Sequence, residues 1–173
     1  KKTKCWIRLP NWLGDVVMVL PLIRVLRNAR PDAEFTLLCR PEFQPLLELL
    51  KIGDLIKPLP NKGTPSYYLK VLQWDEQYPD LHILFTNSLR GDLESYLIGA
   101  PQRFGLELPR KPRCLLTHTY KPTKEIIKQI KTTHQTKLWE KMLRHFGLTT
   151  EITANPYSLS NFKRRSNKFG FIP

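Results

Sequence analysis

Short apolar runs and helix-like segments alternate along the first hundred residues of this 173-residue chain. The apolar runs predict strands at residues 4–9, 34–39, 55–59, 81–85 and 103–105. The segments between them predict helices at residues 15–28, 66–77 and 89–98, and a short helix that starts at Pro41. Strands that alternate with helices of this length form right-handed βαβ units. We therefore expect an α/β fold, a Rossmann-like parallel sheet with helices on both faces.

The rest of the chain predicts an extension of this domain followed by a boundary. A further strand is expected at residues 115–118, and an amphipathic helix at residues 136–146 that ends at Gly147. We expect the α/β domain to span residues 1–150, a linker to span residues 151–167, and residues 168–173 to begin a second domain. The chain lacks an initiator Met and stops inside an apolar run, so we expect both ends to be cut points in a longer protein.

The positive charge of the chain is concentrated in one segment. The formal net charge is +13, from 28 Lys and Arg against 15 Asp and Glu. Residues 108–145 carry ten basic and two acidic side chains, whereas residues 9–107 are close to neutral. Such a segment favours a polyanionic partner, either a phosphorylated lipid, a nucleic acid or a sugar acid. A solvated basic face without a dedicated ligand is the alternative.

The composition argues against several classes of protein. No apolar run approaches the roughly 18–20 residues of a membrane helix, and no signal peptide is visible. Three scattered cysteines fit neither a disulfide framework nor a zinc site, and they favour a reducing, cytosolic compartment. The histidines have no metal-ligand spacing, and no nucleophile elbow is present.

In a parallel α/β sheet, ligands bind where the strands end at their carboxyl termini, and the loop at residues 10–15 belongs there. It holds Asn11, Trp12, Gly14 and Asp15, but neither a G-x-G-x-x-G motif nor a Walker A loop. Two interpretations of Asp15 stay open. It is either an acid that stabilises the start of a helix or a carboxylate that acts as a general base.

The loop after the fourth predicted strand belongs to the same edge of the sheet. Asn87, Ser88 and Arg90 offer amide, hydroxyl and guanidinium groups at the start of a helix. These groups suit sugar hydroxyls or an anion. Simple capping of the helix by Asn87 or Ser88 is the alternative.

Residues 121–131 form a short basic amphipathic stretch. Its isoleucines share one face and its lysines lie on the other side, a pattern that suits the surface of an anionic membrane. Packing of the isoleucines on the domain is the alternative.

The chain resembles the ADP-heptose:lipopolysaccharide heptosyltransferases, glycosyltransferase family 9, in five stretches that follow the family's order. These are LPNWLGDVVM at residues 9–18 with PLI at 21–23, RPDA at 30–33, CRPEF at 39–43 with PLL at 45–47, TNS at 86–88 through GAPQRFG at 99–105, and HQ at 134–135 before a helix that contains Trp139. The resemblance covers most of residues 5–147.

The resemblance implies a GT-B enzyme, with two Rossmann-like domains that face each other across a cleft, of which this chain is the N-terminal half. The enzyme transfers heptose from ADP-heptose to the inner core of lipopolysaccharide, with inversion and without a metal. Asp15 matches the family's aspartate that takes the proton from the acceptor hydroxyl. The C-terminal half binds ADP-heptose, so we expect this chain to be inactive alone and to bind no cofactor.

The resemblance also implies which residues contact the acceptor, a lipid A–core glycolipid. They are Asn11, Trp12, Gly14, Asn87, Ser88, Arg90, Arg110, Lys111, Arg113 and His134. We expect the protein to be cytoplasmic, to associate peripherally with the anionic inner membrane, and to bind no specific nucleic acid.

Two other functions stay open at this stage. The basic segment at residues 108–145 suits a non-catalytic polyanion or nucleic-acid binding module, although few aromatic residues interleave its cations. A sugar-binding relative that has lost catalysis is a third alternative, against which the presence of Asp15 counts.

Overall fold

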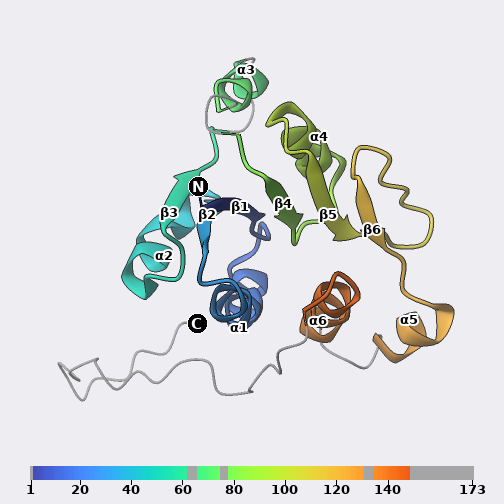
Figure 1. Ribbon diagram of the computed structural model, residues 1–173. Helices are drawn as coiled ribbons and strands as arrows, with labels where there is room; N and C mark the ends of the chain where they lie inside the picture. Colours follow the sequence, from blue (N-terminus) through green and yellow to red (C-terminus); the bar gives the residue numbers. More distant parts are fainter. Residues whose placement is uncertain (1, 62–65, 75–77, 131–134, 149–173) are drawn as a thin grey trace, which may run out of the picture.

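The strands form a single six-stranded sheet in a computed structural model that describes residues 2–61, 66–74, 78–130 and 135–148 (Figure 1). The predicted linker and the predicted start of a second domain lie outside these residues. The strands are β1 (Thr3–Arg8), β2 (Ala33–Cys39), β3 (Leu55–Pro58), β4 (Leu81–Leu84), β5 (Gln102–Leu106) and β6 (His118–Tyr120). All five strand pairs are parallel, which confirms the predicted fold class.

The strand order places a topological switch point in the middle of the sheet. The order is β3-β2-β1-β4-β5-β6. Strands β2 and β3 therefore lie on one side of β1, and β4, β5 and β6 lie on the other. Cys5 pairs with both Phe35 of β2 and Leu81 of β4. In open α/β sheets the loops at such a point diverge and leave room for a ligand. Here they are the β1–α1 and β4–α4 loops.

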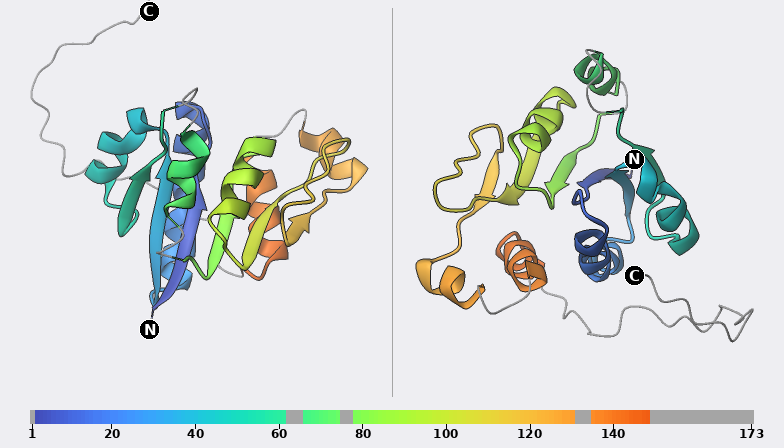
Figure 2. Two further views of the ribbon diagram at one scale, coloured as in Figure 1. Left: turned by 90° about the horizontal axis from the view of Figure 1, so that it is seen from above. Right: turned by 180° about the vertical axis from the view of Figure 1, so that it is seen from behind.

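Helices cover both faces of the sheet, as Figure 1 and the two views of Figure 2 show. One face carries α3 (Tyr67–Leu72) and α4 (Leu89–Leu97). The other side carries α1 (Leu13–Ala29), α2 (Gln44–Leu50), α5 (Lys124–Ile130) and α6 (Gln135–His145), with the short 3₁₀ helix η1 (Pro41–Phe43) before α2. This division follows from right-handed crossovers that reverse direction after β3.

The two faces have separate hydrophobic cores. The larger core packs α1 and α6 against the sheet and includes Trp139 of α6, whose ring meets that of Phe85 edge to face at 5.7 Å between centroids. The smaller core packs α3 and α4 against Trp6 and Leu38. The helix at residues 135–145 is therefore part of this domain, as its apolar spacing predicts.

One prediction of local structure was wrong. The strand expected at residues 115–118 begins only at His118, because Leu116 is used to fill the space above Gly105. Helix α1 continues through Pro21, as the predicted helix at residues 15–28 requires. Pro21 cannot bond the carbonyl of Val17, but Val17 lies on the exposed side of the helix, where water can satisfy that carbonyl.

The basic amphipathic stretch forms α5, and its partly buried Ile126 packs against the larger core. The packing alternative is therefore confirmed for this isoleucine. Among the described residues, no helix combines the length and the apolarity that crossing a bilayer requires.

The structure predicts that α6 contributes strongly to the stability of the domain. Trp139→Ala removes a completely buried ring and should lower the free energy of unfolding by about 3–5 kcal/mol. Lys141→Ala, on the exposed side of the same helix, should change it by less than about 0.5 kcal/mol. Urea denaturation followed by circular dichroism measures both, and equal effects would contradict the packing of α6 on the sheet.

Candidate functional site

The β1–α1 loop leads directly to Asp15 at the carboxyl-terminal edge of the sheet. Helix α1 begins at Leu13, its N-cap residue Trp12 makes no side-chain capping bond, and Asp15 lies in the first turn. The Asp15 side chain is half-buried, whereas Trp12 is 74% exposed and Gly14 is exposed. The loop therefore presents a carboxylate beside a large uncovered aromatic ring.

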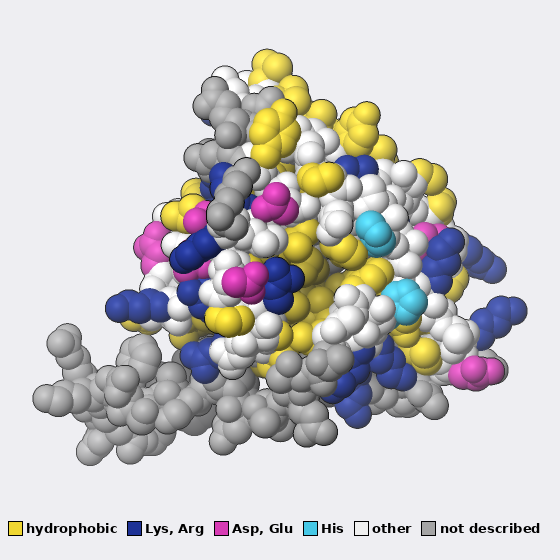
Figure 3. Space-filling view, viewed as in Figure 1, with side chains coloured by type: hydrophobic (Ala, Val, Ile, Leu, Met, Phe, Trp, Pro, Cys, Tyr) yellow, Lys and Arg dark blue, Asp and Glu magenta, His cyan; other side chains and the backbone are white. Residues whose placement is uncertain are grey.

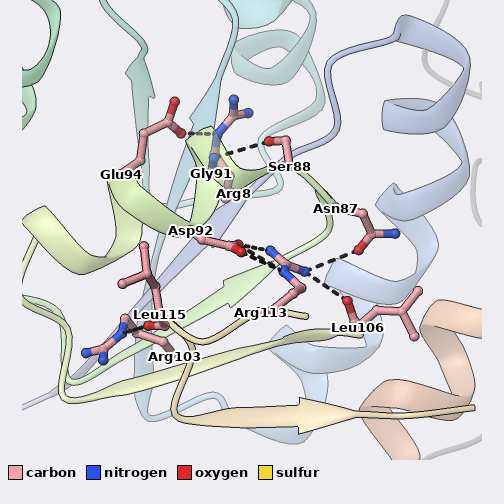
Figure 4. A network of polar contacts seen from close by, with 10 residues as sticks. All are labelled: Arg8, Asn87, Ser88, Gly91, Asp92, Glu94, Arg103, Leu106, Arg113 and Leu115. Atoms are coloured by element: carbon pink, nitrogen blue, oxygen red, sulfur yellow. Dashed lines mark hydrogen bonds and ion pairs between the residues drawn. The ribbon is translucent and has the colours of Figure 1, made fainter. Parts of the chain in front are cut away.

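A buried arginine beneath this loop connects it to α4 (Figure 4). Arg8, the last residue of β1, is 1% exposed and donates from Nε to the Glu94 carboxylate of α4 at 2.8 Å. Its Nη1 donates to the Leu9 carbonyl at 2.6 Å, and its Nη2 to Asn11 Oδ1 at 3.1 Å. Asn11 is thus held by its oxygen, and its amide nitrogen is the group left to face a ligand.

The other oxygen of Glu94 accepts a hydrogen bond from the Tyr67 hydroxyl of α3. Burial, together with this bond to Glu94, raises the pKa of Tyr67. The hydroxyl therefore stays protonated and keeps donating. The guanidinium of Arg90 lies over the Tyr67 ring, 5.6 Å from its centroid, while the Arg90 side chain remains exposed at the edge of the site.

Asn87 and Ser88, two predicted site residues in the β4–α4 loop, have different hydrogen-bond partners. Ser88 is the N-cap of α4, and its hydroxyl accepts from the Gly91 N–H at 3.2 Å. The capping alternative is thus confirmed for Ser88. Asn87 does not cap the helix, because its Oδ1 accepts from Arg113 at 3.2 Å. The start of α4 packs closely on this loop, since a Cβ on Gly91 would lie 2.5 Å from Thr86 Oγ1.

Arg113 is a structural residue in the wall of the site rather than a free cation. It is 5% exposed, and its Nε donates to both oxygens of Asp92 at 2.9 and 3.1 Å. With the bond from Nη2 to Asp92 and those from Nη1 to Asn87 and the Leu106 carbonyl, four of its five N–H groups are used. Arg113 lines the cavity beside α4, but its guanidinium is occupied in holding the loop, and its contact with the acceptor stays a prediction.

This arginine is buried because no helix connects β5 to β6. The loop at residues 107–117 takes the place of a crossover helix, and Arg113 fastens that loop to α4 (Figure 4). Between the loop and the start of α4 lies a cavity of about 340 Å³. Its walls are Asn87, Ser88, Leu89, Asp92, Leu106, Leu108, Lys111, Pro112 and Arg113.

The structure therefore brings together some predicted site residues and separates others. Asn87, Ser88, Lys111 and Arg113 line this one cavity, with Lys111 as an exposed cation in its wall. Asp15 and its loop lie at the same edge of the sheet but do not line the cavity. Arg110 points to the other side of its loop, and His134 lies outside the described residues.

Several residues of the site could not be recognised from their sequence neighbourhood. Arg8 reads as a polar position in a strand, and Asp92 and Glu94 read as surface acids of a helix. Arg40 adds a link, since its Nη1 donates to the Asn11 carbonyl at 3.3 Å. The only available signal was a charged residue at the end of an otherwise apolar strand, which requires a buried partner.

His82 is the second residue of β4. It is completely buried, but neither ring nitrogen has a hydrogen-bond partner among the described residues. Burial, helped by the charges of Arg8 and Arg103, lowers its pKa to about 3. His82 is therefore neutral at pH 7 and cannot serve the site as an acid.

A second cavity, of about 300 Å³, lies at the opposite, amino-terminal end of the strands. Figure 3 shows it as an apolar hollow between α1 and α6. Its lining is mainly apolar and includes Leu26, Phe104 and Phe146. Ligands of doubly wound sheets bind at the other end. Within the described ranges, no group of three metal-ligating side chains could hold a metal ion.

The strand order and the helices on both faces define a doubly wound α/β domain, and solved structures share this fold. The chain is similar to a glycosyl transferase family 9 protein from Veillonella parvula DSM 2008, with TM-score 0.72 and 19% identity over 89% of this chain and 44% of that one. It is also similar to the E. coli heptosyltransferase WaaC with ADP, with TM-score 0.66 and 13% identity over 88% and 49%.

A third similar structure is E. coli ADP-heptose lps heptosyltransferase II, with TM-score 0.57 and 22% identity over 71% of this chain and 36% of that one. The chain thus spans less than half the length of each of these proteins. No protein-family model matches the chain, and no curated protein matches it in sequence. At these identities the likeness shows a shared fold.

The ion pair of Asp92 and Arg113 should be indispensable for the structure of the site. Asp92→Ala leaves a buried guanidinium without its carboxylate and should lower the free energy of unfolding by about 3–5 kcal/mol. Asp32→Ala, which breaks the exposed pair with Arg30, is the matched control and should leave the urea midpoint almost unchanged. Similar midpoints for the two variants would show that Arg113 is not fixed by Asp92.

Proposed function

We propose that this chain is the acceptor-binding half of a glycosyltransferase that transfers heptose from ADP-heptose to the inner core of lipopolysaccharide. The observation that carries the proposal is the position of Asp15. It follows the β1–α1 loop at the switch point of a sheet whose fold is similar to that of family 9 transferases. Two of the sequence stretches that resemble this family, at residues 9–18 and 86–88, include the β1–α1 and β4–α4 loops.

The acceptor binds across the two loops at the switch point in this proposal. The exposed Trp12 ring offers a flat apolar surface for a sugar, and the Asn11 amide offers a donor to its hydroxyls. Lys111 in the cavity wall and Arg90 in the first turn of α4 supply positive charge. These groups suit a glycolipid whose sugars carry carboxylate or phosphate groups.

Asp15 acts as the general base. Its carboxylate takes the proton from the acceptor hydroxyl as that oxygen attacks the anomeric carbon of the donor sugar. The bond from this carbon to the ADP oxygen breaks on the opposite face, so the configuration inverts. The donor site belongs to the second half of the enzyme, and this chain supplies only the acceptor and the base.

The pairing of cations favours this function over a nucleic-acid binding module. Within the basic segment at residues 108–145, Arg113 is neutralised inside the protein by Asp92, and Arg144 is paired with Glu140. A nucleic-acid strip needs cations that remain available to successive phosphates. The remaining positive charge suits attraction to an anionic membrane surface, where the acceptor is anchored.

Substitution of the proposed base should separate catalysis from binding. In the full-length protein, Asp15→Asn should lower kcat by about 10²–10⁴-fold, because the acceptor hydroxyl loses its proton acceptor. The dissociation constant for the acceptor should change little. Steady-state transfer from ADP-heptose to a deacylated inner-core glycolipid measures the first quantity, and calorimetric titration of the acceptor measures the second.

Glu48→Gln is the control, because that carboxylate lies on α2 and is hydrogen bonded to Gln44. It should leave both quantities unchanged. Retention of more than a tenth of kcat by Asp15→Asn would remove Asp15 from the role of base. Absence of transfer by the unmodified protein would overturn the proposed reaction.

A further inference from the structure

The tip of the β5–β6 loop adopts a backbone conformation that its sequence does not favour. The Lys111 N–H donates to the Leu108 carbonyl at 3.1 Å and closes a four-residue turn with Pro109 and Arg110 at its centre. Arg110 has φ of 63°, in the left-handed region. A turn with Pro first and positive φ second is of the kind that takes Gly or Asn at the second position.

The left-handed conformation destabilises any residue that has a Cβ, because this atom crowds the neighbouring carbonyl oxygen. Glycine would form the same turn without that cost. The described residues offer Arg110 no ion pair, and its side chain is exposed. The structure of the turn therefore does not explain the arginine, and an unfavourable backbone that is retained points to a function of the side chain.

Arg110 also lines a cavity of about 310 Å³ on the outer side of the loop, and this cavity offers a binding place for a ligand of its side chain. The other lining residues are Glu107, Leu108, Pro109, Pro112, Lys121 and Pro122. This cavity is distinct from the one beside α4, and the two share only Leu108 and Pro112 as a dividing wall. The three prolines give the outer cavity a lining with little conformational freedom.

The lining of the outer cavity carries a net positive charge. Arg110 and Lys121 contribute two cations and Glu107 one anion. Lys121 Nζ lies 2.9 Å from Glu107 Oε1, and this contact keeps the pKa of Glu107 below its usual range. The Lys121 side chain is still 69% exposed, and its ammonium has two further N–H groups to offer.

We propose that Arg110 and Lys121 form a second anion subsite, which takes a phosphate group on the outer side of the β5–β6 loop. The inference rests on the proposed function, in which the acceptor is a phosphorylated glycolipid, and adds to it a separate place for one phosphate. Arg113 fixes the loop from within, Lys111 faces the inner cavity, and Arg110 serves the outer one.

The chain offers a matched control for the backbone argument. Lys51, which ends α2, is also an exposed residue with positive φ, at 49°, and its N–H donates to the Leu47 carbonyl as in a typical left-handed helix end. It lines neither cavity at the carboxyl-terminal edge. Arg110→Gly and Lys51→Gly therefore relieve the same kind of backbone cost, but only one removes a proposed ligand contact.

The experiment compares these variants in the full-length protein by thermal unfolding and by calorimetric titration with inorganic phosphate at low salt. Both glycine variants should raise the unfolding midpoint by about 1–4 °C. Arg110→Gly should weaken phosphate binding at least fivefold, and Lys51→Gly should leave it unchanged. Glu107→Gln should strengthen phosphate binding, because it removes the only anion from the cavity lining.

The inference is overturned if Arg110→Gly binds phosphate as well as the unmodified protein does, or if it fails to raise the midpoint while Lys51→Gly does. Weaker phosphate binding by Glu107→Gln would also overturn it. None of these measurements requires glycosyl transfer. A protein that shows the expected changes but transfers no heptose would therefore overturn the proposed reaction and leave the phosphate subsite standing.

Discussion

Helix α4 carries two buried carboxylates on which the geometry of the site depends. Asp92 and Glu94 are two positions apart, about 200° around the helix, so they face opposite sides. Glu94 holds Arg8 beneath the β1–α1 loop, and Asp92 holds Arg113 in the β5–β6 loop. A buried charge that loses its partner costs several kcal/mol, so neither loop can move away from α4 without a large penalty. The helix thereby fixes the relative positions of these two loops, which come from distant parts of the sequence.

This way of building the site explains why the first loop carries no glycine-rich motif. In dinucleotide-binding folds, glycines let the backbone approach a pyrophosphate at the start of the first helix. Here Arg8 and Arg40 hold Asn11 from below, and the loop presents side chains instead, with Trp12 uncovered. A loop that displays an aromatic ring and a carboxylate suits a sugar acceptor better than a bound nucleotide. This loop is consistent with the proposed enzyme, in which the other half of the protein binds the nucleotide.

The sequence was sufficient to predict the fold, because apolar periodicity and turn residues are local signals. All six strands and the main helices were expected, and the error at residues 115–118 concerns where a strand begins. The site was predictable only where local chemistry marks it, as at Ser88. The roles of Arg113 and Asn87 depend on a carboxylate 21 residues from the arginine. No spacing rule encodes that pairing, because it arises from the position of the β5–β6 loop over α4.

The ion pairs and cavities change which kind of anionic ligand the positive charge of the chain favours. In sequence, residues 108–145 form one continuous basic segment. In the structure, Arg113 is neutralised inside the protein, Arg110 and Lys111 face cavities on opposite sides of one loop, and Lys137 and Lys141 lie on the outward side of α6. A continuous strip of phosphates would meet interruptions along this path, whereas separate anionic groups on a branched ligand would each find a cation. The arrangement therefore favours a ligand with discrete, spaced charges, which is the form that phosphates and carboxylates take on a glycolipid core.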